Sequence, residues 1–224
     1  MHRPAAPPRP WSVVVAGAAL IAVWAAVIAF RVLHLQPGSV DARWDAMTAA
    51  TDAPALHAVA TALAVIGTGV PAAAVAVAAA LWMLAARGRP AGLLVIVASL
   101  ASELQVSVMK VVAMRTRPDS AFGVGTAFPS GHTANAALLA TVLVLLVRHL
   151  AVRVPAVLYV VAMAWSRTAL HAHWLTDVVA GAAAGAATAV LLHAAFRALT
   201  DARDAPRPSA GAGILAGTTK EPTP

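Results

Sequence analysis

Cysteine is absent from this sequence, and charged and aromatic residues are scarce. Of the 224 residues, 11% are charged and 5% are aromatic. The lack of cysteine excludes a disulfide framework and thiolate chemistry. The scarcity of charge excludes an ordinary soluble domain, in which about 25% of residues are charged. Because 60% of the residues are apolar, the composition predicts an integral membrane protein with the lipid bilayer as its partner.

Acidic residues are scarcer than basic ones. The sequence has 9 acidic and 16 basic residues, which gives a formal net charge of +7. The basic residues are scattered and form no stripe, so no nucleic-acid partner is expected. Histidines and carboxylates do not recur at the spacing of metal ligands, so neither a metal site nor a cofactor is expected.

Six apolar segments are predicted to cross the bilayer as helices. A span needs about 20 apolar residues, and the first segment, 11–30, has 20 without a charge. We interpret it as a retained helix, because the apolar core of a signal peptide is shorter. The predicted fold class is all-α, a polytopic membrane bundle of six transmembrane helices: 11–30, 70–86, 90–109, 133–147, 155–165 and 174–196.

Two glycine-containing sequences should shape this bundle. The apolar run 55–86 has 32 residues, which is too long for one upright span, and the sequence from Gly67 to Pro71 interrupts it. We expect the part before the interruption to be tilted or to lie along the membrane surface. In the last segment, Gly181 and Gly185 have the spacing that lets two helix backbones approach closely.

The helices are predicted to form one domain, 11–197, between a cytoplasmic N-terminal tail, 1–10, and a disordered cytoplasmic C-terminal tail, 198–224. Six spans place both termini on one side of the membrane. That side would hold 10 of the 16 basic residues, so the positive-inside rule makes it the cytoplasmic side of the cell membrane. The remaining basic residues would then lie on the extracytoplasmic face: Arg31, Arg43, Lys110, Arg115, Arg117 and Arg167.

The polar segment 166–177 on that face combines several reactive side chains. His173 and Asp177 are four residues apart, so on a helix the carboxylate would lie one turn from the imidazole and on its face. Such a pair fixes one histidine tautomer and leaves the other ring nitrogen free to attack.

A second polar segment, 110–118, follows the third span and places two cations, Lys110 and Arg117, at the membrane surface. Arg167 makes a third cation there, and none of the three has a nearby carboxylate. This arrangement indicates an anionic ligand.

The segment 129–132 is a third polar sequence with the features of a helix start. Ser130 can cap the helix, and Gly131 lets the backbone approach a ligand closely. Free amides at a helix N-terminus favour a phosphate. His132 and His173 can then act as acid and nucleophile. Taken singly, each residue has a simpler interpretation, such as a membrane-surface anchor or a plain cap; the combination is what indicates a site.

These three segments resemble the three signature motifs of the type 2 phosphatidic acid phosphatase (PAP2) superfamily, which also includes vanadium haloperoxidases and bacterial lipid-pyrophosphate phosphatases. The order, type and spacing of the residues agree, and the resemblance covers residues 10–197. The matching residues are Lys110, Arg117 and Pro118 in the first motif, Pro129, Ser130, Gly131 and His132 in the second, and Ser166, Arg167, His173 and Asp177 in the third.

The resemblance implies a metal-independent membrane phosphatase that acts on a lipid phosphate or diphosphate. By it, His173 attacks phosphorus to form a phosphohistidine, and Asp177 orients His173. His132 protonates the leaving alkoxide and later activates water. The groups that hold the phosphoryl oxygens are Lys110, Arg117, Ser130, Gly131 and Arg167.

Several alternatives stay open at the level of the sequence. Phosphatidic acid, phosphatidylglycerophosphate and polyprenyl diphosphate all present the same phosphoryl group. A phosphotransferase of the same superfamily would carry the same motifs. A non-enzymatic transporter or binder of anionic headgroups needs only the cations, so the complete set of acid, nucleophile and carboxylate argues against it. The predicted spans exclude a soluble haloperoxidase.

Two further ionisable residues lie near the motifs. His171 is two residues from His173, so on a helix it would point away from the site. Glu103 lies within the third span, seven residues before Lys110. Ionisable residues in a span usually face the bundle interior, so we expect Glu103 to face protein in a supporting role. A protonated glutamate that makes one interhelical hydrogen bond is the alternative.

Overall fold

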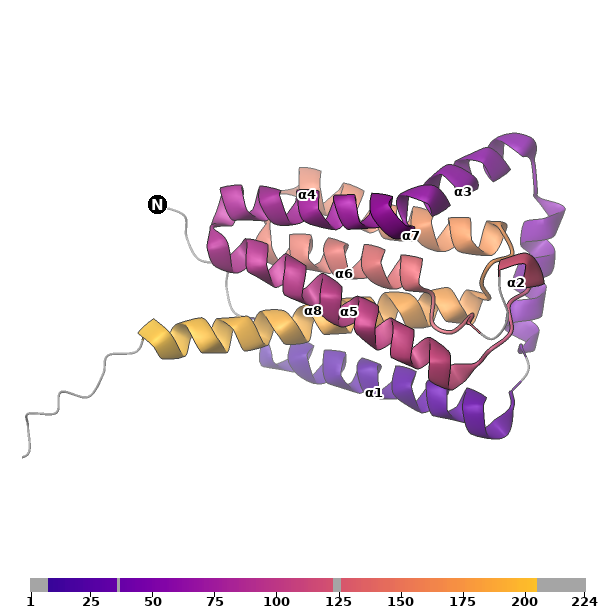
Figure 1. Ribbon diagram of the computed structural model, residues 1–224, viewed down its shortest axis with the longest axis horizontal. Helices are drawn as coiled ribbons and strands as arrows, with labels where there is room; N and C mark the ends of the chain where they lie inside the picture. The colour runs from indigo at the N-terminus through magenta and orange to yellow at the C-terminus, as the bar shows by residue number, and fades with distance from the viewer. Residues whose placement is uncertain (1–7, 36, 123–125, 205–224) are drawn as a thin grey trace, which may run out of the picture.

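The computed structural model describes residues 8–35, 37–122 and 126–204. Over these ranges the chain forms eight α-helices and one short 3-10 helix and contains no strand, which confirms the predicted all-α class (Figure 1). The elements are α1 (Pro10–Leu33), α2 (Ser39–Ala50), α3 (Pro54–Ile66), α4 (Gly69–Arg87), α5 (Arg89–Ala113), η1 (Ser120–Phe122), α6 (Gly131–Leu146), α7 (Leu150–Ala169) and α8 (Leu175–Asp204).

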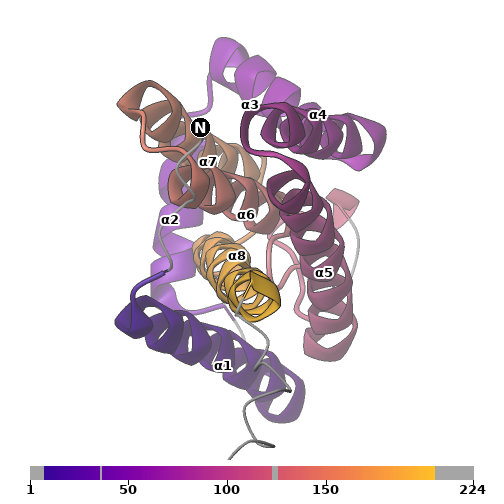
Figure 2. The same ribbon diagram turned by 90° about the vertical axis from the view of Figure 1, so that its left-hand side faces the viewer.

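Six of these helices correspond to the six predicted spans. Within the described residues, α1, α4, α5, α7 and α8 are long and apolar enough to cross a membrane, whereas α6 is apolar but has only 16 residues. α6 packs against α5, α7 and α8, so its neighbours enclose it. α8 lies at the centre of the bundle, as the view along the helices shows (Figure 2). The chain is therefore a multi-pass helical bundle.

A break between α3 and α4 confirms the predicted interruption of the long apolar run. α3 ends at Ile66 and α4 starts at Gly69, which has a φ of 53°. The two helices point in different directions (Figure 1), and α3 packs against α7 while α4 packs against α5. α2 lies across one end of the bundle and contacts α7 and α8.

Close backbone contact joins α8 to α6 at the predicted glycines. A Cβ atom on Gly181 would collide with the backbone of Ser130, and one on Gly185 would collide with the backbone of Ala134. Only glycine therefore allows this approach. The contact brings the start of α8 against the start of α6, and Ser130 N–H donates to the Asp177 carbonyl oxygen over 3.0 Å.

α7 and α8 differ most in length from the sequence-based expectation. α7 begins at Leu150 rather than near residue 155, and Arg153 in its first turn donates to the carbonyl oxygens of Val144 and Val147 at the end of α6. These bonds satisfy helix-end carbonyls that lack an intrahelical partner. α8 continues past the expected boundary at residue 197 to Asp204, and an Arg197–Asp201 ion pair of 3.2 Å spans this extension. Most of both predicted tails, 1–7 and 205–224, lies outside the described residues.

Candidate active site

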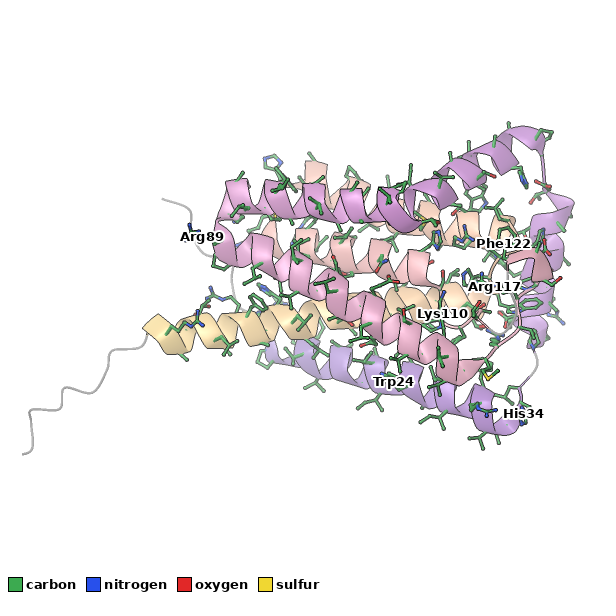
Figure 3. The ribbon with its side chains drawn as sticks, in the orientation of Figure 1. Trp24, His34, Arg89, Lys110, Arg117 and Phe122 are labelled. Carbon is green, nitrogen blue, oxygen red and sulfur yellow. The ribbon has the colours of Figure 1, made fainter. Side chains whose placement is uncertain are left out.

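The three polar segments meet at the end of the bundle that α2 covers (Figure 1). Lys110 and Arg117 lie together at this end, and Arg89 lies at the opposite end (Figure 3). Arg117 Nη1 donates to the Ala172 carbonyl oxygen over 2.7 Å, which ties the first segment to the third. Lys110 Nζ is within 3.8 Å of the position that a Cβ on Gly131 would occupy, which ties the first segment to the second. The convergence expected from the motifs is therefore present.

The ring of His173 is held in one tautomer. Its Nε2 lies 3.2 Å from Arg117 Nη1, and a guanidinium can only donate. Nε2 is therefore the acceptor, and Nδ1 carries the proton in the neutral ring. Nδ1 faces Asp177 Oδ2 at 3.6 Å, as the spacing predicted. The helix does not supply this geometry, however, because α8 begins at Leu175, after His173.

Burial sets the charge state of His173. The residue is only 2% exposed, and burial lowers its pKa from 6.5 to about 4, although Asp177 opposes this shift. The lowered pKa keeps the imidazole neutral near pH 7. A neutral ring with an unprotonated Nε2 is the nucleophilic form of histidine.

Asp177 is completely buried at the start of α8. Its Oδ2 accepts the Trp174 backbone N–H over 2.8 Å. This bond satisfies one of the free amides at the helix N-terminus. Its Oδ1 accepts from Arg115 Nη1, a contact that the motifs do not indicate.

Arg115 and Asp41 are the two buried residues at this site that sequence reasoning missed. Arg115 Nη2 donates to Asp41 Oδ2 over 2.6 Å, and the guanidinium lies 4.4 Å from the centre of the Phe30 ring. Arg115 could have been noticed as a basic residue two positions before Arg117. Asp41 gives no sequence signal, because 74 residues separate it from Arg115.

Three cations at the site have no carboxylate partner. Among the described residues, the ion pairs involve none of Lys110, Arg117 and Arg167. Arg167 is 4% exposed and its Nε has no hydrogen-bond partner. Burial lowers the pKa of Arg117, and the Asp177 carboxylate opposes this change. A buried cation without a counter-charge, such as Arg167, is costly, so the site favours an anion.

The start of α6 differs in one detail from the prediction. Ser130 occupies the N-cap position, but its side chain makes no capping hydrogen bond. Instead its hydroxyl oxygen accepts from Thr133 Oγ1 over 3.2 Å. The hydroxyl hydrogen therefore stays available for another acceptor, since a hydroxyl can donate and accept together.

His132 contacts the break between α3 and α4. Its Nε2 lies 2.8 Å from Thr68 Oγ1 and 3.1 Å from the Ala64 carbonyl oxygen. The carbonyl can only accept, so Nε2 carries the proton in the neutral ring. No feature of the sequence connects His132 with this break. Gly67 makes the contact possible, because a Cβ there would collide with the imidazole.

His171 and Glu103 lie beside the site. His171 has a φ of 52° and pairs with Asp45 of α2, with 2.7 Å between Nδ1 and Oδ1, so it points away from His173 as expected. Glu103 is exposed rather than turned into the protein, which corrects the expectation. Its Oε2 accepts from Asn135 Nδ2 on α6 over 3.2 Å, so the interhelical hydrogen bond of the alternative interpretation is present.

The fold and these contacts define a multi-pass membrane protein with a buried histidine–aspartate pair among unpaired cations. Residues 91–201, which contain all three motifs, match the family model of the PAP2 superfamily. The chain belongs to this superfamily. No curated protein matches the sequence.

Two solved structures share the fold. One is a transmembrane PAP2-type phosphatidylglycerolphosphate phosphatase from Bacillus subtilis, with a TM-score of 0.65 and 24% identity over 84% of this chain and 96% of that one. The other is LpxE from Aquifex aeolicus, with a TM-score of 0.59 and 21% identity over 70% of this chain and 97% of that one. The similarity includes helices outside the family match, so the whole bundle has the architecture of membrane PAP2 phosphatases.

Proposed function

We propose that this protein is an integral membrane phosphatase that hydrolyses a lipid phosphate or diphosphate through a phosphohistidine at His173. The observation that carries the proposal is the orientation of His173. Its unprotonated Nε2 faces Arg117, and its Nδ1 faces the buried Asp177. A binding protein would need the cations but not an oriented nucleophile.

Binding of the phosphate is assigned to groups from all three motifs. Lys110, Arg117 and Arg167 would neutralise the phosphoryl oxygens, and the Ser130 hydroxyl and Gly131 amide would donate to them. Fixed donors that match the charge of the transition state are the main catalytic device in phosphoryl transfer. Because side chains supply this charge, the proposed reaction does not require a metal ion.

The chemistry would proceed in two steps. In the first, His173 Nε2 forms a bond to phosphorus while the bond from phosphorus to the lipid oxygen breaks, and protonated His132 gives its proton to that oxygen. The Nδ1 proton stays on His173 and faces Asp177, which balances the positive charge of the substituted ring. In the second, water attacks phosphorus and gives a proton to His132, the bond from phosphorus to Nε2 breaks, and phosphate leaves.

We also propose that the site faces the extracytoplasmic side of the cell membrane and that both termini are cytoplasmic. The support is the predicted split of the basic residues, of which 10 of 16 fall on the side that holds both termini. Several of the remaining six are the cations of the site, where an anionic substrate explains their presence.

Phosphate release from a lipid panel tests the proposed function. Purified protein is assayed with phosphatidic acid, phosphatidylglycerophosphate and polyprenyl diphosphate, with and without EDTA. We expect release from at least one lipid, retained in EDTA, blocked by vanadate and absent from His173→Ala. Loss of activity on chelation, with recovery on adding magnesium, would contradict the histidine mechanism. Labelling of an added alcohol in place of phosphate release would indicate a phosphotransferase.

A further inference from the structure

A buried ion network joins α2 to the site through a residue outside the three motifs. Arg115 donates to Asp177 Oδ1 with one terminal nitrogen and to Asp41 Oδ2 with the other. The three side chains are at most 3% exposed. Removing one partner from such a network leaves an uncompensated buried charge, so each member depends on the other two.

The network fixes the direction of the Asp177 carboxylate. Arg115 holds Oδ1, and the Trp174 backbone N–H holds Oδ2 at 2.8 Å. With one donor on each oxygen the carboxylate cannot rotate freely. Oδ2 is thereby kept towards His173 Nδ1, 3.6 Å away. The Arg115 contact thus determines which oxygen faces the nucleophile.

Asp41 holds the start of the helix that carries Asp177. Its Oδ1 accepts the Thr176 backbone N–H over 2.9 Å, and its Oδ2 accepts from Thr176 Oγ1 over 2.8 Å. An acidic group at a helix N-terminus satisfies free amides and interacts well with the helix dipole. Asp41 is 2% exposed, so water does not compete for these bonds.

The charges of the network also bear on His173. Asp177 must remain effectively negative to balance the ring when Nε2 is phosphorylated. Arg115 alone would cancel that charge. Asp41 supplies a second carboxylate, so one cation is shared between two anions and the network as a whole carries a net charge of −1.

We propose that Asp41 and Arg115 are positioning residues that orient Asp177 towards His173 and set the charge that His173 experiences. This inference rests on the proposed function of the site. It adds α2, which lies outside the family match, to the parts of the chain on which catalysis depends.

The first test measures the pKa of His173 by NMR in full-length protein with labelled histidine, where His173→Asn assigns the signal. Arg115→Ala removes a cation and should raise the pKa, whereas Asp41→Asn removes an anion and should lower it. The other groups facing His173, namely Asp177, Arg117, Lys110 and His132, are unchanged in both variants. Asp45→Asn, on the same helix but outside the network, should change the pKa little.

The second test uses lipid hydrolysis. We expect Arg115→Ala and Asp41→Asn to lower kcat about 10²-fold, as misplacement of a catalytic group by about 1 Å does. KM should change little in both variants. The control variant Asp45→Asn should keep a nearly normal kcat. Arg115 lines a cavity of about 220 Å³ together with Phe30, Arg31 and His34. Millimolar guanidinium should therefore enter Arg115→Ala and restore at least 10-fold in kcat, but should not restore His173→Ala.

Several results would overturn the inference. Shifts of the His173 pKa in the same direction in both variants, or no shift, would show that the network does not set its charge. Equal losses of kcat in Asp45→Asn and Asp41→Asn would show that only the docking of α2 matters. If Arg115→Ala does not fold, the result for Asp41→Asn decides the test. The amide oxygen that this substitution leaves can still accept a hydrogen bond from Thr176, so the variant keeps a contact with the start of α8. If the wild type hydrolyses no lipid, the proposed function fails, whereas the NMR result still decides the positioning role.

Discussion

The role of His132 depends on how much the leaving group needs a proton. A lipid alkoxide is a poor leaving group, whereas a nitrophenolate or the phosphate of a diphosphate leaves readily. His132→Ala should therefore slow the hydrolysis of alkyl phosphate monoesters by about 10²–10⁴-fold, and that of aryl phosphates or diphosphates much less. Measuring kcat/KM for both substrate types checks this prediction.

The same variant should accumulate phosphorylated His173 with an activated substrate, because the attacking water loses its base. An alkaline denaturing quench preserves the acid-labile bond from phosphorus to nitrogen, so the phosphoenzyme can be detected. Equal slowing of both substrate types, without a burst or phosphoenzyme, would make His132 a phosphate-binding residue instead.

His173 should make the protein sensitive to acid. Its pKa is about 4 in the folded chain and 6.5 as a free side chain, so between these values the unfolded chain binds a proton that the folded chain does not. The contribution of His173 to the free energy of unfolding is therefore constant above pH 6.5. It is lost as the pH drops towards 4, by about 3 kcal/mol in total.

Thermal unfolding of wild type and His173→Asn at several pH values measures this difference. The wild type should lose more stability than the variant between pH 6.5 and 4. Parallel curves for the two proteins would show that His173 is not buried in its neutral form.

The break between α3 and α4 gives a prediction at the level of an element. A Cβ at residue 67 would collide with the His132 ring and lie 3.1 Å from Met163 Cε. Gly67→Ala should therefore displace His132 while the bundle still folds, because the end of a side chain can move. We expect the substrate-dependent loss predicted for His132→Ala, about 10-fold or more for alkyl monoesters.

Gly69→Ala is a matched control, because no atom lies within 4 Å of its Cβ position although its φ is positive. It should strain the backbone without contacting His132. An equal loss in both variants, or unchanged kinetics in Gly67→Ala, would contradict a role for the break in holding His132.

The elements show which parts of this molecule a sequence can predict. The spans and the break follow from hydropathy and glycine, which act locally. The start of α7 does not, because Arg153 is drawn into the helix by carbonyl oxygens at the end of α6. In the site, the motifs predicted the meeting of Lys110, Arg117 and His173. They could not predict Asp41, whose pairing with Arg115 exists only after α2 folds back across the bundle.

The orientation of the whole molecule can be tested with single cysteines in this cysteine-free chain. Ala121 and Arg89 are both exposed, and the labelled Arg89 lies at the opposite end of the bundle from Phe122, the neighbour of Ala121 (Figure 3). In intact cells an impermeant thiol reagent should label Ala121→Cys and not Arg89→Cys, because the site is proposed to face outward. Labelling of both in opened cells is the control. The reverse pattern in intact cells would invert the proposed topology.

The shortness of α6 has a consequence for the two products. With 16 residues, this helix is about 24 Å long, less than the roughly 30 Å of the hydrocarbon layer. Ser130 and Gly131, which are proposed to bind the phosphate, lie at the start of this helix. In Figure 1 this start lies deeper in the bundle than the neighbouring ends of α1 and α7. Cleavage would then happen below the surface of the membrane. The freed phosphate would leave towards the end of the bundle that α2 covers, whereas the dephosphorylated lipid would remain in the bilayer, so the two products would part in different directions.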